Sequence, residues 1–214
     1  MKQNLNSWEK RLNIYTSECD ASKEDAYHYP YEPTPYAVLE RLVESDYILP
    51  EKIVLDYGCG KGRVGFFLNH RIGCHVIGID FDDRMYEMAQ ENLYKFEARN
   101  KALEEGMLYK NALESGGKIE FFCESAEQYE VESADCFYFF NPFSVEILQS
   151  VIGKIIKSYY NKPREMQLFF YYPSDEYISY LMTVPELCFV DEIDCTDLNI
   201  GYNEREKILI FEVF

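Results

Sequence analysis

The sequence lacks a long apolar run, paired cysteines and an amino-terminal apolar segment. No stretch approaches the roughly 18 consecutive apolar residues that a membrane-spanning helix needs, and residues 1–12 do not resemble a signal peptide. The seven cysteines are odd in number and include no C-x-x-C pair, which favours free thiols over disulfides or a zinc site. We therefore expect a cytoplasmic protein with no metal and no membrane association.

Basic residues are also scarce. The sequence has 21 Lys and Arg against 38 Asp and Glu, a formal net charge of −17. Affinity for nucleic acid comes largely from neutralising phosphates, so this balance disfavours a nucleic-acid partner, although a local basic patch would still permit one. The sequence contains no H-E-x-x-H motif and no catalytic-triad signature.

Strand-like and helix-like patterns alternate from residue 52 onward. Apolar spacing predicts helices around 85–96 and 148–159, and Thr34-Pro35 indicates another helix with Pro35 at its first position. Residues 97–117 fit an extended or second helix. We predict strands at 52–57, 75–80, 118–123, 134–140, 166–172, 187–194 and 207–213.

This alternation is typical of an α/β fold with a doubly wound, mostly parallel seven-stranded sheet. The last two predicted strands have no helical pattern between them, so we expect a C-terminal antiparallel hairpin. The length of 214 residues suits one domain. We expect residues 1–33 to form an amino-terminal extension or lid and residues 34–214 to form the core.

The strongest signal is the run VLDYGCGKG. An apolar strand leads to Asp56, and Gly58, Gly60 and Gly62 follow at alternate positions. Glycine lets the chain turn sharply and lets its backbone approach a ligand, and the helix that follows offers free N–H groups. The run predicts a ligand-binding turn, with a turn that serves packing alone as the alternative.

Two classes of cofactor compete for this turn. A dinucleotide motif, G-x-G-x-x-G, needs its third glycine where the chain has Arg63. The pattern D-x-G-x-G-x-G instead resembles motif I of class I S-adenosylmethionine-dependent methyltransferases, and the D-Y-G-C-G-K-G and N-P-F runs together resemble a bacterial methyltransferase-like group. The resemblance implies S-adenosyl-L-methionine as the cofactor, in contact with Asp56, Tyr57, Gly58, Cys59, Gly60 and Gly62.

The resemblance extends to the ends of the next two strands. Asp80 lies 22 residues after Gly58 and is similar to the acid that binds the cofactor ribose, with Phe81 as an apolar contact of the adenine. A simple helix cap is the alternative for Asp80. Families of this kind often have Asp-Ala after the third strand, where this chain has Ser125-Ala126, and we expect adenine contacts from these two residues.

The run FYFFNPFS follows the fourth strand. It resembles the N-P-P-[YF] motif of methyltransferases that act on amino groups, but it has one proline and its aromatic residue comes one position early. The resemblance implies catalytic roles for Asn141, Pro142 and Phe143, with Asn141 also near the cofactor. A turn that merely ends the strand is the alternative, because a residue before proline is pushed to extended geometry.

Tyrosines surround the expected site. The run YHYPYEPTPY, residues 27–36, precedes the first helix of the core and is similar to the lid segment of related enzymes. Tyr29, Tyr31 and Thr34 are the expected lid or substrate residues, and Tyr171 extends the wall. A tyrosine ring can also hold a cation, whereas an aromatic cluster that only packs the segment on the core is the alternative.

Together these features predict an S-adenosylmethionine-dependent methyltransferase that acts mainly by positioning. We expect an unidentified small-molecule acceptor. The alternatives are an amino-methyltransferase that acts on nucleic acid or protein, and a non-catalytic cofactor-binding module. The oligomeric state and the methylated atom do not follow from the sequence.

Overall fold

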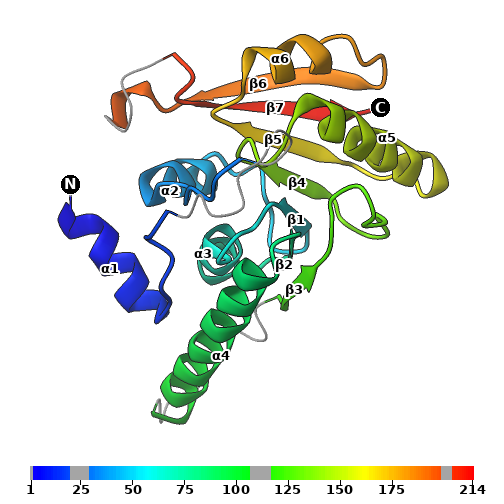
Figure 1. The fold of residues 1–214 in the computed structure, drawn as a ribbon. Helices are drawn as coiled ribbons and strands as arrows, with labels where there is room; N and C mark the ends of the chain where they lie inside the picture. The colour runs from blue at the N-terminus through cyan, green and yellow to red at the C-terminus, as the bar shows by residue number, and fades with distance from the viewer. Residues whose placement is uncertain (1, 20–28, 107–116, 199–203) are drawn as a thin grey trace.

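One seven-stranded sheet organises the computed structural model, which describes residues 2–19, 29–106, 117–198 and 204–214 (Figure 1). The strand order across the sheet is β3-β2-β1-β4-β5-β7-β6. The strands are β1 (Ile53–Tyr57), β2 (His75–Asp80), β3 (Ile119–Cys123), β4 (Cys136–Phe139), β5 (Gln167–Tyr171), β6 (Leu187–Asp194) and β7 (Lys207–Val213).

Five neighbouring strands run parallel, and the last two complete the sheet in antiparallel fashion. Strand β1 pairs in parallel with both β2 and β4, while β7 pairs antiparallel with β5 and with β6. The predicted strands, the doubly wound sheet and the C-terminal antiparallel hairpin are confirmed, with strand bounds that differ by a residue or two. The hairpin's connection contains a short 3₁₀ turn, η1 (Thr196–Leu198).

Helices cover both faces of the sheet. Trp8, Leu39, Phe66 and Ala89 belong to one buried apolar cluster, whereas Leu148 belongs to a second cluster on the other face. The two clusters arise because strands buried on both sides are apolar at successive positions. The first face carries α1 (Lys2–Leu12), α2 (Tyr36–Glu44), α3 (Arg63–Ile72) and α4 (Asp83–Gly106), and the second carries α5 (Val145–Asn161) and α6 (Asp175–Leu181).

Four details of the helices differ from the prediction or extend it. Pro35 is not the first helical residue, because its ψ of 136° is extended and α2 begins at Tyr36. Helix α4 continues to Gly106, which agrees with an extended helix, and residues 107–116 lie outside the described part of the chain. The predictions did not include α1, which has few apolar residues, or α6, which is only seven residues long.

The parallel strands direct their carboxyl ends toward one edge of the sheet. Since β1, β2 and β4 are neighbours in register, the loops that follow them lie side by side. Ligands of open α/β sheets bind at this edge. It is also where most of the predicted site residues are found.

Candidate functional site

The loop between β1 and α3 contains glycines with left-handed backbone angles. Gly58 has a φ of +70° and Gly60 a φ of +53°, a region that residues with a Cβ rarely adopt. A Cβ on Gly58 would lie 2.4 Å from Cβ of Pro142, and a Cβ on Gly60 would lie 2.1 Å from Cε2 of Tyr31. The loop is thus held closely between two neighbouring segments, and only glycine fits.

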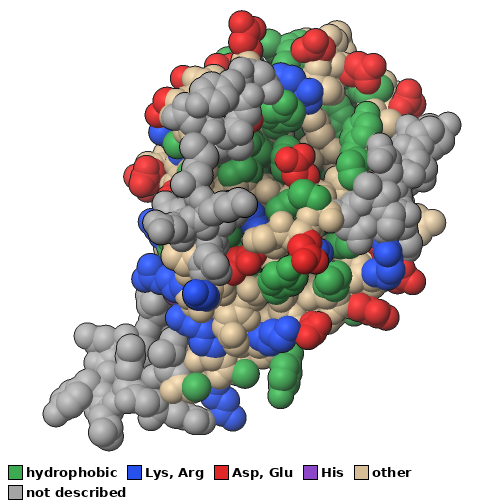
Figure 2. Space-filling view, turned by 60° about the vertical axis from the view of Figure 1, so that its left-hand side comes forward, with side chains coloured by type: hydrophobic (Ala, Val, Ile, Leu, Met, Phe, Trp, Pro, Cys, Tyr) green, Lys and Arg blue, Asp and Glu red, His purple; other side chains and the backbone are tan. Residues whose placement is uncertain are grey.

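A pocket lies beside this loop. It is lined mainly by residues 29–34, 56–59, 79–82, 124–126 and 140–143. These are the segments in which most of the site residues were predicted, so tertiary structure brings them together from five regions of the chain. Figure 2 shows hydrophobic and acidic side chains next to one another near the middle of one face of the molecule.

Asp56 has a buried carboxylate, and one of its oxygens accepts no hydrogen bond from the described residues. The residue is 3% exposed, and its Oδ2 has no hydrogen-bond partner in the described part of the chain. Burial, followed by the negative charge of Asp80, raises the pKa of Asp56 to about 8. A buried polar group without a partner is costly, so Asp56 is suited to a ligand that brings a positive charge or a hydrogen-bond donor.

Asp80, at the end of β2, has a different environment. Its Oδ2 accepts the N–H of Gly60 at 2.8 Å, and its Oδ1 accepts the N–H of Asp82 at 2.9 Å. Both carboxylate oxygens of Asp80 thus accept a backbone N–H. Asp80 therefore ties the glycine loop to β2 while it also lines the pocket.

Phe81, Ser125 and Ala126 line the pocket where the chain leaves β2 and β3. Phe81 is 39% exposed and lines the pocket. The Ser125 hydroxyl accepts the N–H of Glu127 at 3.3 Å, which closes a local turn. The Phe81 ring and the small side chains of Ser125 and Ala126 thus line the pocket beside Glu124, with no acidic side chain at position 125.

Asn141 follows β4 with an unusual backbone, at a φ of +41°. Its Nδ2 donates to the carbonyl of Tyr172 at 2.7 Å, and its Oδ1 accepts the N–H of Ser174 at 3.3 Å. The carboxamide therefore fixes the loop between β5 and α6. One lone pair of Oδ1 is left for a ligand, and Asn141 lines the pocket.

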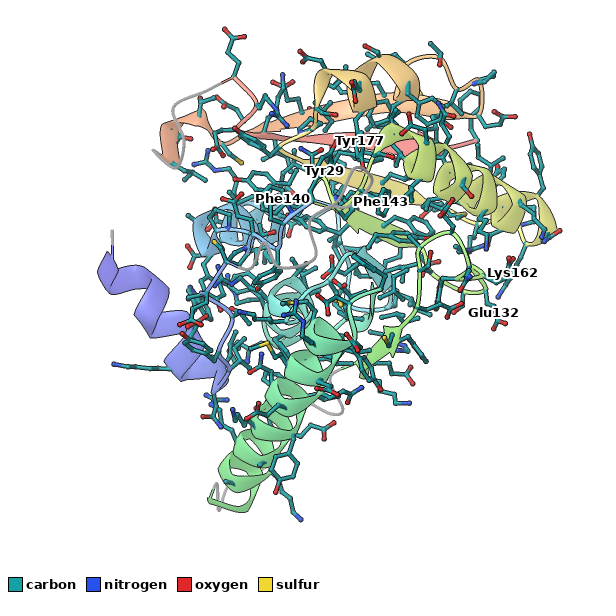
Figure 3. The ribbon with its side chains drawn as sticks, in the orientation of Figure 1. Tyr29, Glu132, Phe140, Phe143, Lys162 and Tyr177 are labelled. Carbon is teal, nitrogen blue, oxygen red and sulfur yellow. The ribbon has the colours of Figure 1, made fainter. Side chains whose placement is uncertain are left out.

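Aromatic rings form the wall near Asn141. Figure 3 shows Tyr29, Phe140 and Phe143 at the carboxyl end of β4, and all three line the pocket. Phe143 is 4% exposed. Phe140 is half-buried and was not selected from the sequence, although strand alternation puts it on the same face as Tyr138.

Tyr171 lies behind this wall. It is not among the pocket-lining residues. Its ring centroid is 4.7 Å from that of Phe140, and its hydroxyl donates to Oε2 of the buried Glu206 at 2.8 Å. Tyr171 therefore supports the pocket through Phe140. Gly60 and Gly62 are likewise not among the pocket-lining residues and pack against Tyr31 and Phe121.

The segment before α2 crosses the glycine loop. The Tyr31 hydroxyl donates to the carbonyl of Thr16 at 2.9 Å, and the ammonium of Lys61 lies 5.0 Å from the Tyr31 ring centroid. The Thr34 hydroxyl bonds to that of Tyr138 at 3.2 Å. His28, at the start of the segment, lies outside the described residues, as does most of the stretch that links it to Thr16.

Arg63 holds the amino-terminal region in place. It is 2% exposed, and its Nε donates to Thr16 Oγ1 at 2.7 Å while Nη2 donates to Glu9 Oε1 at 3.2 Å. Its Nη1 donates to the carbonyl of Thr34 at 3.1 Å, and its Cζ lies 4.5 Å from the Tyr36 ring centroid. Sequence reasoning used Arg63 only to disfavour a dinucleotide motif and missed this role.

No cluster of three or more His, Cys, Asp or Glu side chains in the described ranges is arranged to hold a metal ion. Within the same ranges, no helix combines the length and the apolar character that a membrane crossing requires.

A parallel α/β sheet, a glycine loop after its first strand and carboxylates at the ends of its first two strands define class I S-adenosylmethionine-dependent methyltransferases. The chain belongs to the methyltransferase domain family, whose model matches residues 54–161. The family uses S-adenosylmethionine, so the predicted enzyme class and cofactor are confirmed.

Two curated relatives match part of the chain. A protein-lysine N-methyltransferase of Saccharolobus islandicus is 32% identical over 69 residues, which cover 32% of this chain and 43% of the relative. A histone-lysine N-methyltransferase specific for lysine 79 of H3, from Dictyostelium discoideum, is 33% identical over 72 residues, or 34% of this chain and 4% of the relative. The matches thus span less than half of either relative.

Solved structures share the fold at low identity. A TehB-like methyltransferase from Corynebacterium glutamicum has a TM-score of 0.54 and 14% identity, with 99% of this chain and 96% of that chain covered. A magnesium protoporphyrin IX methyltransferase from Synechocystis, with bound S-adenosylmethionine, has a TM-score of 0.51 and 19% identity over 83% of this chain and 76% of that one. A tRNA (uracil-54, C5) methyltransferase from Pyrococcus abyssi has a TM-score of 0.52 and 19% identity, over 84% and 38%.

Proposed function

We propose that the protein transfers a methyl group from S-adenosylmethionine to a small-molecule acceptor, mainly by positioning. The observation that carries the proposal is that the glycine loop lies next to the carboxylate of Asp56, whose Oδ2 has no partner among the described residues. The cofactor has an ammonium group that would satisfy Asp56 Oδ2, and Gly58 lines the pocket next to Asp56. Residues at the pocket therefore fit the cofactor.

Each part of the pocket has a proposed role toward the cofactor. Asp56 binds the ammonium group, and the backbone of Gly58 bounds the site. Asp80 accepts from the ribose hydroxyls, and Phe81 covers the adenine. The bound cofactor supplies a methyl group that its sulfonium has already activated, so these residues need only hold it in one orientation.

The acceptor would lie beside the end of β4. The free lone pair of Asn141 Oδ1 and the carbonyl of Pro142 orient an N–H of the acceptor, while Tyr29 and Phe140 flank it. In-line attack requires the reacting atoms to approach within roughly 3–3.5 Å. A neutral amine has its lone pair available, so it needs no strong general base.

The charges of the pocket support a small acceptor over a nucleic acid. Five carboxylates line it, from Glu32, Asp56, Asp80, Asp82 and Glu124, against a single basic side chain among the described lining residues, Arg63. The donors of Arg63 are directed at Glu9, Thr16, Ser17 and Thr34. We further propose that residues 1–33 act as an extension whose segment 29–33 covers the site, with residues 34–214 as the catalytic core.

A methyl-transfer assay on fractionated cell extract would test the acceptor class. Purified protein and tritium-labelled S-adenosylmethionine are incubated with metabolite, protein and RNA fractions. Incorporation into the metabolite fraction that is lost in Asn141→Ala is the expected result. Incorporation only into protein or RNA would overturn the small-molecule assignment, and cofactor binding without any transfer would favour a non-catalytic module.

Protein lysine is the second candidate acceptor. Both curated relatives carry names of protein-lysine methyltransferases, and a lysine ammonium would be attracted to an acidic, aromatic pocket. Label found on lysine in the protein fraction, and absent after addition of the Asn141→Ala variant, would support this candidate.

A further inference from the structure

The glycine loop contains a buried lysine. Lys61 is 2% exposed, although a lysine is almost never fully buried unless its ammonium is paired, because the burial of a charge is costly. Among the described residues, its Nζ donates to the carbonyl of Glu18 at 2.8 Å and lies 5.0 Å from the centroid of the Tyr31 ring. The second distance is short enough for a cation–π contact.

The Tyr31 ring connects this ammonium to the pocket. The ring packs on the backbone of Gly60, where an added Cβ would lie 2.1 Å from Cε2 of Tyr31. Tyr31 lines the pocket, whereas Gly60 and Lys61 do not. Lys61 can therefore act on the pocket through the ring of Tyr31.

Lys61 and Tyr31 also bond to the same stretch of the amino-terminal region. The carbonyl of Glu18 accepts from Lys61, and the carbonyl of Thr16 accepts from the Tyr31 hydroxyl at 2.9 Å. Three neighbours thus hold the Tyr31 ring. Gly60 does so by packing, Thr16 by a hydrogen bond and Lys61 by its charge.

We propose that Lys61 is a positioning residue of the cofactor site, whose ammonium holds the Tyr31 ring in place as a wall of the pocket. The inference rests on the proposed function, since it takes this pocket to be the cofactor site. A wall that is fixed before the ligand arrives avoids the entropic cost of ordering it on binding. Loss of the ammonium should therefore lower cofactor affinity, although no group that lines the pocket is removed.

A double-mutant cycle tests this path by calorimetric titration with S-adenosylhomocysteine. Lys61→Met removes the charge, and Tyr31→Leu removes the ring. We expect Lys61→Met to weaken binding roughly 3- to 10-fold, within the range of a buried cation–π contact. The double variant should bind no more weakly than Tyr31→Leu alone, because the ammonium then has no ring to hold. Additive losses, or wild-type affinity in either single variant, would overturn the inference.

Lys154→Met is a matched control. Lys154 Nζ donates to the carbonyls of Gln128 and Tyr129, at 2.9 and 3.1 Å, and Lys154 does not line the pocket, so we expect affinity within about twofold of wild type. Lys61→Arg keeps a cation that can stack on a ring and should recover most of the affinity. A loss as large as that in Lys61→Met would overturn the role of the charge. Lys61→Gln takes the place of Lys61→Met in the cycle if the latter does not fold.

Fluorescence of Trp8, the one tryptophan of the sequence, separates positioning from a general loosening of the amino-terminal region. Trp8 belongs to α1, and its ring centroid lies 4.9 Å from that of Phe67. Its emission should be the same in ligand-free wild type and Lys61→Met, because the ion pair of Glu9 with Arg63 still holds α1. A red-shifted emission together with weaker binding would show that α1 has left the core, and would overturn the specific role of Lys61. Failure of the wild-type protein to bind S-adenosylhomocysteine would instead overturn the proposed function itself.

Discussion

At the scale of single residues, two neighbouring carboxylates have different environments. Asp80 is satisfied by two backbone N–H groups, whereas Asp56 retains an oxygen with no partner among the described residues. Both acids were selected from the sequence as carboxylates at strand ends, and only the groups that surround them in the fold differ. The difference leads to two separate predictions.

The first prediction concerns Asp56 and pH. Its pKa rises from 3.8 in a model compound to about 8 in the folded protein, so between these values the folded state holds a proton that the unfolded state has lost. The contribution of Asp56 to the free energy of unfolding is therefore complete below about pH 4 and is lost as the pH rises toward about 8.

Denaturant unfolding of ligand-free wild type and Asp56→Asn at pH 5, 6.5 and 8 checks this expectation. The variant should gain stability relative to wild type as the pH rises, because its amide does not ionise. A stability difference that stays constant across the three pH values would contradict the raised pKa.

The second prediction concerns Asp80. Asp80→Ala removes a charged acceptor from the ribose and should weaken S-adenosylhomocysteine binding by about 1.5–3 kcal/mol. Calorimetric titration measures this loss. Because Asp80 also accepts the Gly60 N–H, Asp80→Asn serves as a milder comparison that keeps one acceptor oxygen, and unchanged affinity in both variants would refute the ribose role.

At the scale of elements, a buried ion pair docks α1 on the core. Glu9 and Arg63 lie 3.2 Å apart with side chains 10% and 3% exposed. Glu9 Oε1 also accepts the N–H and the hydroxyl of Thr16, at 2.8 and 2.7 Å. The network joins α1, the stretch after it and the first turn of α3, so the amino-terminal extension is held by polar contacts as well as by Trp8.

Removal of one partner of the Glu9–Arg63 ion pair should strongly destabilise the folded protein. Arg63→Met leaves the Glu9 carboxylate buried without its cation, and we expect a loss of about 3–5 kcal/mol in the free energy of unfolding. Arg41→Met is a matched control, because Arg41 pairs with Asp197 at the surface, where a loss below about 1 kcal/mol is expected. Denaturant unfolding measures both variants. An equal loss in the free energy of unfolding would show that the buried ion pair stabilises the protein no more than the surface pair does.

At the scale of the whole molecule, cofactor binding should stabilise the fold. A ligand that binds only the folded state at 100 times its dissociation constant adds about 2.7 kcal/mol, which corresponds to a rise of roughly 5–10 °C in melting temperature for a chain of this size. Thermal unfolding with S-adenosylhomocysteine should show this rise, and NAD should give none. A rise in melting temperature with NAD alone would instead favour a dinucleotide cofactor.

The positions of the strands along the chain could be predicted from the sequence, since they depend on local patterns, and the cofactor class followed from the resemblance of the glycine motif to a known family. Apolar runs separated by turn residues marked the strands, and the spacing from Asp56 through Gly62 to Asp80 marked the ends of β1 and β2. Short polar helices such as α1 left no comparable pattern. Residues 97–117 remained ambiguous because their glycines interrupt a helix-forming composition.

Contacts between distant residues were decided only by tertiary structure. Arg63 meets Glu9 across 54 positions of sequence, and Asn141 bonds to Tyr172 across 31; no local pattern encodes either pair. Burial gave Asp56 its raised pKa. The sequence by itself determined where the strands and the glycine loop lie, because residue spacing sets local geometry, and the ligand class followed from the resemblance of the loop to a known motif. Packing determined which side chains remain free to bind it, because only the folded chain shows which groups are already satisfied.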